Sequence, residues 1–386
     1  STDALQKTGQ GQPASQDRHK LLCYRQGTTC RAMGREAMLR LMIYGATGYV
    51  GEHVARTAAR AGMAPILAGR NIVKLDHIFG ELSLERRAFG LDDPAAVDRA
   101  LAGVGVLLNC AGPFEATAHA LAEACLRSKT HYLDITGEIP VYEMLQRLDG
   151  LAKSRGVLLL PGAGFDVTPT DCLALHLKQR LPSATHLRMA FQSVGPAGLP
   201  PGTQRTAIHM LHYGGRIRVN GKLIKPQTTK AISVDFGKGP IRADPVPWGD
   251  VFTAYYSTGI GNISDYIAAT ASLRLQLAIG RVLAPISRIA AIRRLLLATV
   301  RPGANAEQRG QTRTHVWGEV TDENGERAVA RVHGPEAGLD WTTITALGAV
   351  SKVLAGVAPA GYQTPASAFG ADFVLEGEGV AREDIL

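Results

Sequence analysis

The chain of 386 residues has few cysteines, and these form no metal-binding pattern. The five cysteines are scattered, and no two of them form a C-x-x-C pair: Cys23, Cys30, Cys110, Cys125 and Cys172. Zinc sites and disulfide frameworks depend on closely spaced or even-numbered cysteines. We therefore expect no metal site and a reducing compartment, which we take to be the cytoplasm.

Long hydrophobic runs are also missing. No stretch approaches the roughly 18 consecutive apolar residues of a membrane-spanning helix, and the residues before Leu41 do not have the pattern of a signal peptide. The composition, with 45% hydrophobic and 20% charged residues, is that of an ordinary globular protein. A chain of this length is expected to fold as two domains.

Negative charge is absent from one part of the chain. Residues 268–301 hold six arginines and no aspartate or glutamate, and the whole chain has a net charge of +8. A nucleic-acid reader would present such charge with aromatic residues on a recognisable module, and the sequence contains none. We therefore expect no nucleic-acid partner.

A short apolar run at residues 41–44 ends in three evenly spaced glycines. The spacing is G-x-x-G-x-x-G, and a helical pattern that includes Val54 and Ala58 follows it. Strand, glycine-rich turn and helix together are typical of a dinucleotide-binding site, because glycines let the backbone approach the pyrophosphate at a helix N-terminus. A tight turn in another α/β protein is the alternative. The expected contacts are Gly45, Ala46, Thr47, Gly48, Tyr49, Val50 and Gly51.

The end of the next expected strand, 64–70, favours NADP(H) over NAD(H). An NAD site usually has a carboxylate about 20 residues after the glycines, to bind the ribose hydroxyl. Here that place holds Arg70 and Asn71, with Lys74 close by and no acid before Asp76. An arginine can bind the 2′-phosphate of NADP(H). An exposed loop arginine without a ligand is the alternative.

Strands and helices alternate up to about residue 170. We expect further strands at 85–90, 105–110, 131–135 and 157–160, and helices at 119–128, 141–154 and 171–181. Another helix should start near Pro94, with Asp92 or Asp93 as its cap. This alternation predicts a Rossmann-like doubly wound parallel sheet. Additional cofactor contacts are expected after the third and fourth strands, at Leu91, Cys110, Ala111, Gly112, Pro113 and Phe114.

The second half of the chain predicts an α+β domain with a mostly antiparallel sheet. Residues 186–256 contain short alternating runs, 313–333 has the pattern of a hairpin with an Asn-Gly turn, and 341–356 reads as a helix. We expect four parts. Residues 1–38 form a disordered or artificially added extension, 39–170 the Rossmann domain, 171–355 the substrate and dimerisation domain, and 356–386 a segment that returns to the Rossmann domain.

Residues 263–300 are expected to form an amphipathic, basic helical segment broken at Pro285. Arg274, Arg281 and Arg288 are spaced seven apart and would share one face. Two interpretations stay open. The segment is either a solvated helix face covering a substrate cleft, or a surface that contacts a membrane or an acidic carrier protein.

Five segments together resemble the saccharopine dehydrogenase-like oxidoreductases: 45–51, 68–70, 109–114, 132–138 and 161–166. The nearer branch is that of the trans-acting enoyl reductases of lipid and polyketide synthesis. The resemblance implies an NADP-binding Rossmann domain, and an inserted α+β domain that completes the substrate site and often mediates dimers. Where the family often has Asp-Pro-Gly-Tyr, this chain has residues 336–339 as Glu-Ala-Gly-Leu, which leaves the substrate open.

The expected reaction is NADPH-dependent reduction of a C=C (enoyl) or C=N bond in an organic or acyl substrate. Short-chain reductases have a tyrosine that is followed four residues later by a lysine. Tyr49, Tyr132 and Tyr142 all lack a lysine at that distance. Proton donors are therefore sought among Asp134, Glu138, Asp166, His209 and His212, and the sequence singles out none. A non-catalytic dinucleotide sensor or membrane-associated scaffold is the alternative function.

Overall fold

The computed structural model describes residues 39–210, 215–226, 230–271, 274–275, 279, 287 and 289–386. Residues Leu39–Leu386 form one compact unit. The expected extension 1–38, His212, and Arg281 and Arg288 of the basic segment lie outside the described residues. Within the described part of the chain, no helix is long and apolar enough to cross a membrane.

The first sheet is parallel throughout and has seven strands in the order β15-β6-β5-β4-β1-β2-β3. Its strands are β1 Leu41–Tyr44, β2 Ile66–Gly69, β3 Arg86–Ala88, β4 Val106–Asn109, β5 His131–Asp134, β6 Leu158–Leu160 and β15 Gly361–Tyr362. The order 3-2-1-4-5-6 is that of a Rossmann fold, in which ligands bind beside the carboxyl ends of the strands. The expected doubly wound sheet is confirmed, and β15 extends it at one edge.

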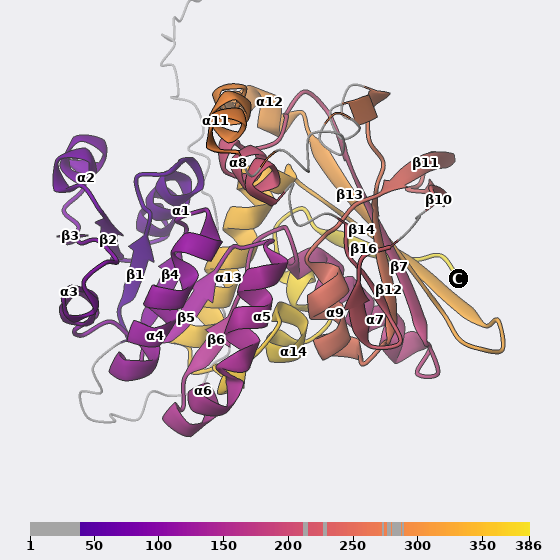
Figure 1. The fold of residues 1–386 in the computed structure, drawn as a ribbon, viewed down its shortest axis with the longest axis horizontal. Helices are drawn as coiled ribbons and strands as arrows, with labels where there is room; N and C mark the ends of the chain where they lie inside the picture. The colour runs from indigo at the N-terminus through magenta and orange to yellow at the C-terminus, as the bar shows by residue number, and fades with distance from the viewer. Residues whose placement is uncertain are drawn as a thin grey trace, which may run out of the picture. The chain divides into compact units, whose positions relative to one another are not determined.

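Helices cover both faces of this sheet. The first half of the chain contributes α1 Tyr49–Arg60, α2 Ile72–Phe79, α3 Pro94–Ala100, α4 Ala118–Ser128, α5 Ile139–Arg147, α6 Asp149–Arg155 and α7 Thr168–Arg180. A late helix, α13 Thr342–Leu354, contacts α1, β4 and β5. In Figure 1, α4 and α6 lie in front of the sheet and α13 lies behind it. The helix expected at 341–356 therefore returns to the first sheet.

The prediction of a single helix at 141–154 is wrong, because the helix is interrupted at Leu148, which separates α5 from α6. Gly150 lowers the helix propensity there. The break lets the Asp149 carboxylate accept a hydrogen bond from the Tyr362 backbone at 2.9 Å, which fastens β15 to this edge. A contact 213 residues away in sequence has thus overridden the local periodicity.

The second sheet has nine strands, in the order β10-β11-β12-β7-β13-β14-β16, with β8 paired to β12 and β9 paired to β8. Its strands are β7 His186–Val194, β8 Ile217–Val219, β9 Lys222–Ile224, β10 Ile232–Asp235, β11 Pro240–Pro245, β12 Asn262–Ile267, β13 Arg313–Thr321, β14 Arg327–Gly334 and β16 Ala381–Asp384. The hairpin expected at 313–333 is present as β13 and β14. The pairs are antiparallel except β12 with β7, which run parallel.

Two expectations for the second half of the chain need correction. The stretch 186–256 is not all sheet, since it also holds α8 Pro201–Met210 and α9 Asp250–Thr258. The basic segment does not begin as a helix, because 262–267 is strand β12, which pairs with β7 and β8. The tail also pairs as a strand, β16, so that the C-terminal residues contribute to both sheets.

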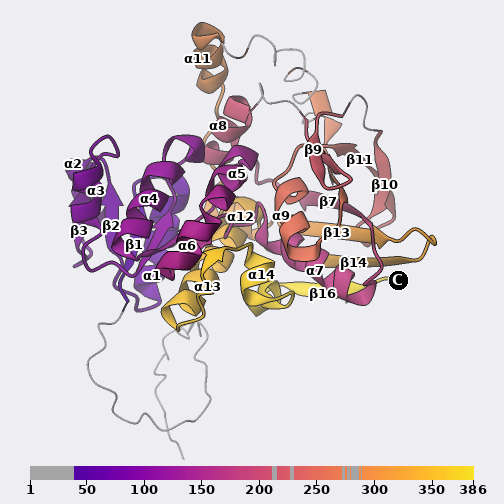
Figure 2. The same ribbon diagram turned by 60° about the horizontal axis from the view of Figure 1, so that its bottom comes forward.

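Short elements complete the chain: α11 Ala290–Ala298, α12 Ala306–Gly310, the π-helical turn Ala337–Trp341, α14 Pro365–Phe369 and the 3-10 turns Phe114–Ala116 and Phe373–Glu376. In both views, the first sheet with its helices and the second sheet lie side by side, with α7 and α9 near their junction (Figures 1 and 2).

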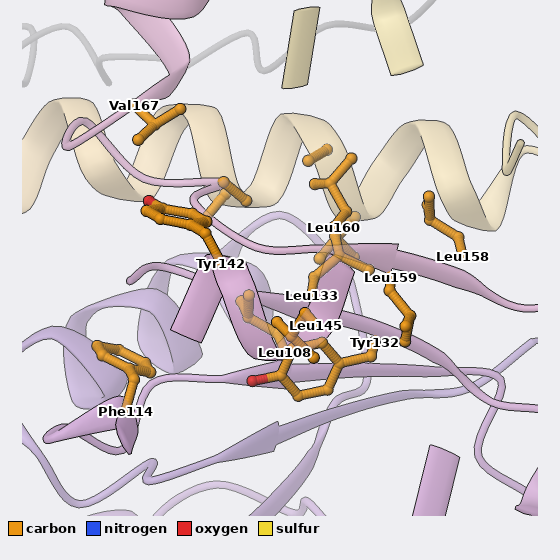
Figure 3. Packing of buried hydrophobic residues seen from close by; sticks show 14 of the residues in the cluster. Leu108, Phe114, Tyr132, Leu133, Tyr142, Leu145, Leu158, Leu159, Leu160 and Val167 are labelled. Carbon is orange, nitrogen blue, oxygen red and sulfur yellow. The ribbon is translucent and has the colours of Figure 1, made fainter. Parts of the chain in front are cut away.

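The core under the first sheet holds the strand ends in place. Leu108, Leu133 and Leu159 are fully buried in neighbouring strands, as expected for a sheet covered on both faces. Tyr132 and Tyr142 are also fully buried and pack among these leucines (Figure 3). Phe114 lies at the edge of this cluster, in the turn that follows β4. The loops at the carboxyl ends therefore start from a rigid base.

Candidate functional site

The first glycine of the turn is required by its backbone and by its neighbour. Gly45 has a φ of +81°, a conformation that side chains disfavour. A Cβ atom there would lie 2.8 Å from both the backbone nitrogen and the Cβ of Ala111. The loops after β1 and β4 therefore touch at this point, which brings together two of the segments expected to bind the dinucleotide.

The other glycines place the start of α1 against the turn. A Cβ atom on Gly51 would lie 2.2 Å from the Gly45 carbonyl oxygen, so only glycine fits. Gly48 is the N-cap of α1, and no side chain caps this end. The first N–H groups of α1 thus have no acceptor within the helix, and they form the anion-binding end expected for a pyrophosphate.

Arg70 follows β2 in the loop before α2. Its side chain is exposed, and no acidic partner lies within salt-bridge distance among the described residues. Asn71 caps α2, because its side chain accepts the Lys74 N–H at 3.0 Å. Asp76, the first acid after β2, lies 3.5 Å from Arg86 instead. The region therefore offers a free guanidinium where a 2′-phosphate would lie.

The loop after β4 is held by a chain of hydrogen bonds. The Asn109 side chain accepts the Ala111 N–H at 2.9 Å and donates to the Tyr132 hydroxyl, which donates to Asp134 at 2.8 Å. Burial raises the pKa of the Cys110 thiol to about 12. Cys110 therefore contributes backbone and bulk to the loop, not a reactive thiolate.

Asp134 is a structural carboxylate. It is fully buried and accepts the N–H groups of Thr136 and Gly162, both at 3.0 Å. Burial raises its pKa to about 7, and these N–H bonds oppose that rise. Its oxygens are engaged in fixing the loops after β5 and β6, so the expectation that Asp134 could deliver a proton has no geometric support.

Glu138 also holds backbone rather than facing an open site. Its carboxylate accepts the N–H groups of Phe114 at 2.9 Å and Glu115 at 2.7 Å. The Thr206 hydroxyl on α8 donates to the same carboxylate at 3.3 Å. Burial raises the Glu138 pKa, and the hydrogen bonds oppose that rise.

Asp166 differs from both. It lies in the loop after β6, retains some exposure to solvent, and a Cβ atom on Gly137 would meet its Oδ2 at 3.0 Å. Burial, followed by the charge of Glu138, raises its pKa to about 7. Of the carboxylates expected from the sequence, Asp166 alone combines partial exposure with a pKa suited to proton transfer near neutral pH.

Aromatic side chains adjoin Asp166. The indole N–H of Trp248 donates to the Asp166 carbonyl at 2.5 Å, and the Trp248 ring lies 4.6 Å from that of Phe191. Phe165 contacts both Phe191 and Trp341. His209, the remaining described candidate, lies half-buried on α8.

The sequence did not predict one set of contacts at the glycine turn. The Tyr49 hydroxyl donates to the Ala304 carbonyl at 2.9 Å, and Arg309 donates to the same carbonyl and to Asp340. A Cβ atom on Gly303 would lie 2.3 Å from the Tyr49 ring. No spacing rule links residues 255 positions apart, so no local signal in the sequence indicated this contact.

These features define a Rossmann-type dinucleotide-binding domain joined to a second, mixed sheet. Residues 41–160 match the model of the saccharopine dehydrogenase NADP binding domain. The chain therefore carries an NADP-binding domain, and NADP(H) is its cofactor, as expected from Arg70. Among the described residues, no group of three or more potential ligands could hold a metal ion.

Known proteins support this assignment and the expected resemblance. The chain is 26% identical to a rat saccharopine dehydrogenase-like oxidoreductase over 60% of its length and 58% of the rat protein. It is 28% identical to a trans-acting enoyl reductase of Mycobacterium leprae over 36% of each chain. The chain thus matches only part of these curated relatives. A saccharopine dehydrogenase structure from Saccharomyces cerevisiae has the same fold, with a TM-score of 0.60 at 12% identity over 90% of this chain and all of that one.

Proposed function

We propose that the protein is an NADPH-dependent oxidoreductase that reduces a C=C (enoyl) or C=N bond of an organic or lipid-like substrate. The observation that carries the proposal is the position of Asp166, a partly exposed residue at the carboxyl end of the parallel sheet, whose carboxyl group has a pKa of about 7 because of burial. Ligands of open α/β sheets bind at this edge. The names of the rat and Mycobacterium relatives agree with a reductase.

The cofactor would be held by the turn and by three loops. The N-terminus of α1 and the turn glycines would bind the pyrophosphate, and Arg70 the 2′-phosphate, with Asn71, Lys74 and Leu91 nearby. The loop 110–114 would lie along the nicotinamide half. When bound, NADPH supplies a hydride, and the protein contributes position and a proton.

Asp166 would supply that proton. A substrate atom that gains electron density during reduction must be protonated: a carbon next to the activating carbonyl of an enoyl substrate, or the nitrogen of an imine. A carboxyl group with a pKa of about 7 holds a proton in roughly half of the molecules at neutral pH, and can release it readily. The hydrogen bond from the Trp248 indole to the Asp166 carbonyl holds the backbone from which the Asp166 side chain extends.

The surroundings of Asp166 favour an apolar substrate. The Trp248 indole bonds to the Asp166 backbone carbonyl, and its ring packs against that of Phe191. Such rings bind apolar groups through dispersion and desolvation. An acyl chain or an aromatic ring attached to the reducible bond would be suited to this wall, whereas a highly charged substrate would not.

A substrate screen tests the proposal. NADPH oxidation is followed by absorbance with enoyl thioesters and with imines formed from aldehydes and amines, for the wild type, for Asp166→Asn and for the exposed control Glu323→Gln. We expect turnover with one class, loss of turnover in Asp166→Asn and retention in Glu323→Gln. NADPH binding without turnover of either class would favour the alternative, a non-catalytic dinucleotide sensor.

We also propose that α11 contacts an anionic membrane surface, as one interpretation of the basic segment. In both views α11 lies at the border of the described structure, next to α8 (Figures 1 and 2). Leu295 is 70% exposed and Ile289 is 53% exposed, and Arg294 lies on the exposed side. An exposed leucine beside an exposed arginine suits a lipid interface with negative headgroups.

The remaining expectations are likewise proposals. We propose a homodimer, which sedimentation velocity would test, and a cytoplasmic location. A related Arabidopsis protein is named as a probable mitochondrial oxidoreductase, so localisation of a tagged full-length protein is the relevant measurement.

A further inference from the structure

The carboxylate of Glu138 lies where three segments meet. Glu138 follows β5 and is only 2% exposed. Its two oxygens accept the N–H groups of Phe114 and Glu115, the first residues of the turn after the loop 110–113. The Thr206 hydroxyl of α8 donates to Oε1. One side chain thus joins the ends of β4 and β5 to a helix that the chain enters only after β7.

The three donors suit an ionised carboxylate. Pro113, the N-cap of the turn Phe114–Ala116, makes no side-chain capping bond, so Glu138 acts as a cap from a distant part of the sequence. Hydrogen bonds to a charged acceptor are stronger than neutral ones, and an unpaired buried carboxylate would be costly. The contacts with the turn and with α8 therefore depend on the same charge.

Helix α8 connects both sides of the expected cofactor site. At Thr206 it bonds to Glu138, and it also contacts α1, the helix that begins at the glycine turn. Gln204 of the same helix pairs with the Arg301 backbone in both directions, at 2.8 and 3.2 Å. Arg301 leads into the segment that Tyr49 holds at Ala304. A single carboxylate thus bonds both to the turn after β4 and to α8.

We infer that Glu138 is a positioning residue that couples occupancy of the NADP(H) site to the position of α8. When the loop 110–114 orders against the nicotinamide half, the N–H groups of Phe114 and Glu115 fix the Glu138 carboxylate, which then holds Thr206. The helix is thereby set in place before substrate arrives. This inference rests on the placement of the cofactor in the proposed function.

Hydrogen exchange with and without NADPH tests the coupling. Peptides covering 110–117 and 201–210 are compared in the wild type, in Thr206→Val and in Glu138→Gln. Thr206→Val removes only the hydroxyl that reaches Glu138, at nearly constant volume. Ser351→Ala is its control, because that hydroxyl bonds only to Leu347 within α13. Glu323→Gln, in the exposed hairpin turn, is the control for the loss of a carboxylate.

In the wild type and both controls, NADPH should protect both peptides. In Thr206→Val, the protection of 110–117 should persist and that of 201–210 should be lost, with an unchanged melting temperature. Glu138→Gln should weaken both and raise the NADPH dissociation constant about tenfold, since an amide has one acceptor oxygen where the carboxylate has two. If Thr206→Val retained the protection of α8, the coupling would be refuted while cofactor binding stood. Failure of the wild type to bind NADPH would instead overturn the proposed function.

Discussion

The Tyr49 hydroxyl donates a hydrogen bond to the Ala304 carbonyl at 2.9 Å and thereby ties the glycine-rich turn to a segment near the second sheet. Tyr49 occupies the first position of α1, so its backbone lies at the anion-binding end of the helix while its side chain points to 303–304. Arg309 donates to the same carbonyl. The start of the cofactor site is therefore stabilised by both halves of the chain.

Replacing a glycine by alanine should have opposite effects on stability in the tightly packed glycine turn and in an open helix position. Gly51→Ala places a methyl group 2.2 Å from the Gly45 carbonyl, which cannot move freely, and should lower the free energy of unfolding by about 1–3 kcal/mol. Gly150→Ala, in exposed α6 with nothing within 4 Å, should raise it by about 0.5–1 kcal/mol. Thermal unfolding of both variants measures this. Equal effects would contradict the packing described here.

Arg70 should distinguish the two nicotinamide cofactors. Arg70→Ala is expected to raise the NADPH dissociation constant by about 10–100-fold, because a charge-assisted hydrogen bond to a phosphate is lost. NADH, which has no 2′-phosphate, should bind as in the wild type. Titration calorimetry with both cofactors provides the measurement, and Arg99→Ala, an exposed arginine on α3, is the control. If the wild type bound both equally and Arg70→Ala changed neither, Arg70 would have no role in selectivity.

Local signals predicted the first sheet well. The apolar runs of β1 and β4, the three glycines and the Asp93 cap of α3 act within a few residues, and Asp93 does accept the Ala95 N–H. What failed depends on distant partners. β12 is a strand because it pairs with β7 and β8, although the arginine pattern that follows it suggested a helix.

The candidate site shows the same division. The glycine turn and Arg70 could be predicted from the sequence, because a dinucleotide site has a direct chemical need for each of these residue types. The roles of Asp134, Glu138 and Asp166 could not be predicted, since all three are carboxylates at or just after the end of a strand. They differ only in what surrounds them: loop N–H groups for Asp134, a turn and α8 for Glu138, and partial solvent exposure for Asp166.

The pH dependence of turnover should report Asp166. Because the proton donor has a pKa of about 7, wild-type kcat/KM should be constant at low pH and fall about tenfold per unit above pH 7. Asp166→Asn should lower kcat/KM by about 10²–10⁴-fold and remove this dependence. Asp134→Asn should instead lower the melting temperature, because that carboxylate holds the Thr136 and Gly162 N–H groups. A pH profile unchanged in Asp166→Asn would exclude it as the donor.

Binding of α11 to lipid should depend on the positive charge of Arg294 and on the exposed side chain of Leu295. The protein should float with vesicles rich in phosphatidylglycerol and not with pure phosphatidylcholine. Leu295→Ser and Arg294→Glu should each reduce flotation several-fold, whereas Val73→Ser, an exposed residue of α2, should not. Flotation that the α11 variants do not change would refute the proposal. Binding of an acidic carrier protein without flotation would favour the other interpretation of this segment.

Two buried carboxylates predict an unusual dependence of stability on pH. Asp250 begins α9 and Asp265 lies in β12; they are 1% and 4% exposed. Asp250 accepts the Thr170 hydroxyl at 2.6 Å, but its other oxygen has no hydrogen-bond partner among the described residues. For Asp265, the Val251 N–H opposes the effect of burial on the pKa. Burial raises the pKa of both well above the usual value, and for Asp250 the charge of Asp265 adds to this.

The folded state therefore retains protons that the unfolded chain releases above about pH 4. Above about pH 4, the free energy of unfolding should therefore fall as the pH rises, until the pH reaches the pKa values of the folded state. Asp265→Asn removes one ionisation and should raise the free energy of unfolding at pH 8 by more than about 1 kcal/mol, with little change at pH 4. Urea unfolding at both values measures this difference. Asp235 should behave in the opposite way, since the Gly237 N–H lowers its pKa. Asp235→Asn should therefore be less stable than the wild type at pH 7. If Asp265→Asn were also less stable than the wild type at pH 8, the buried pair would be ionised and partnered, which contradicts the prediction.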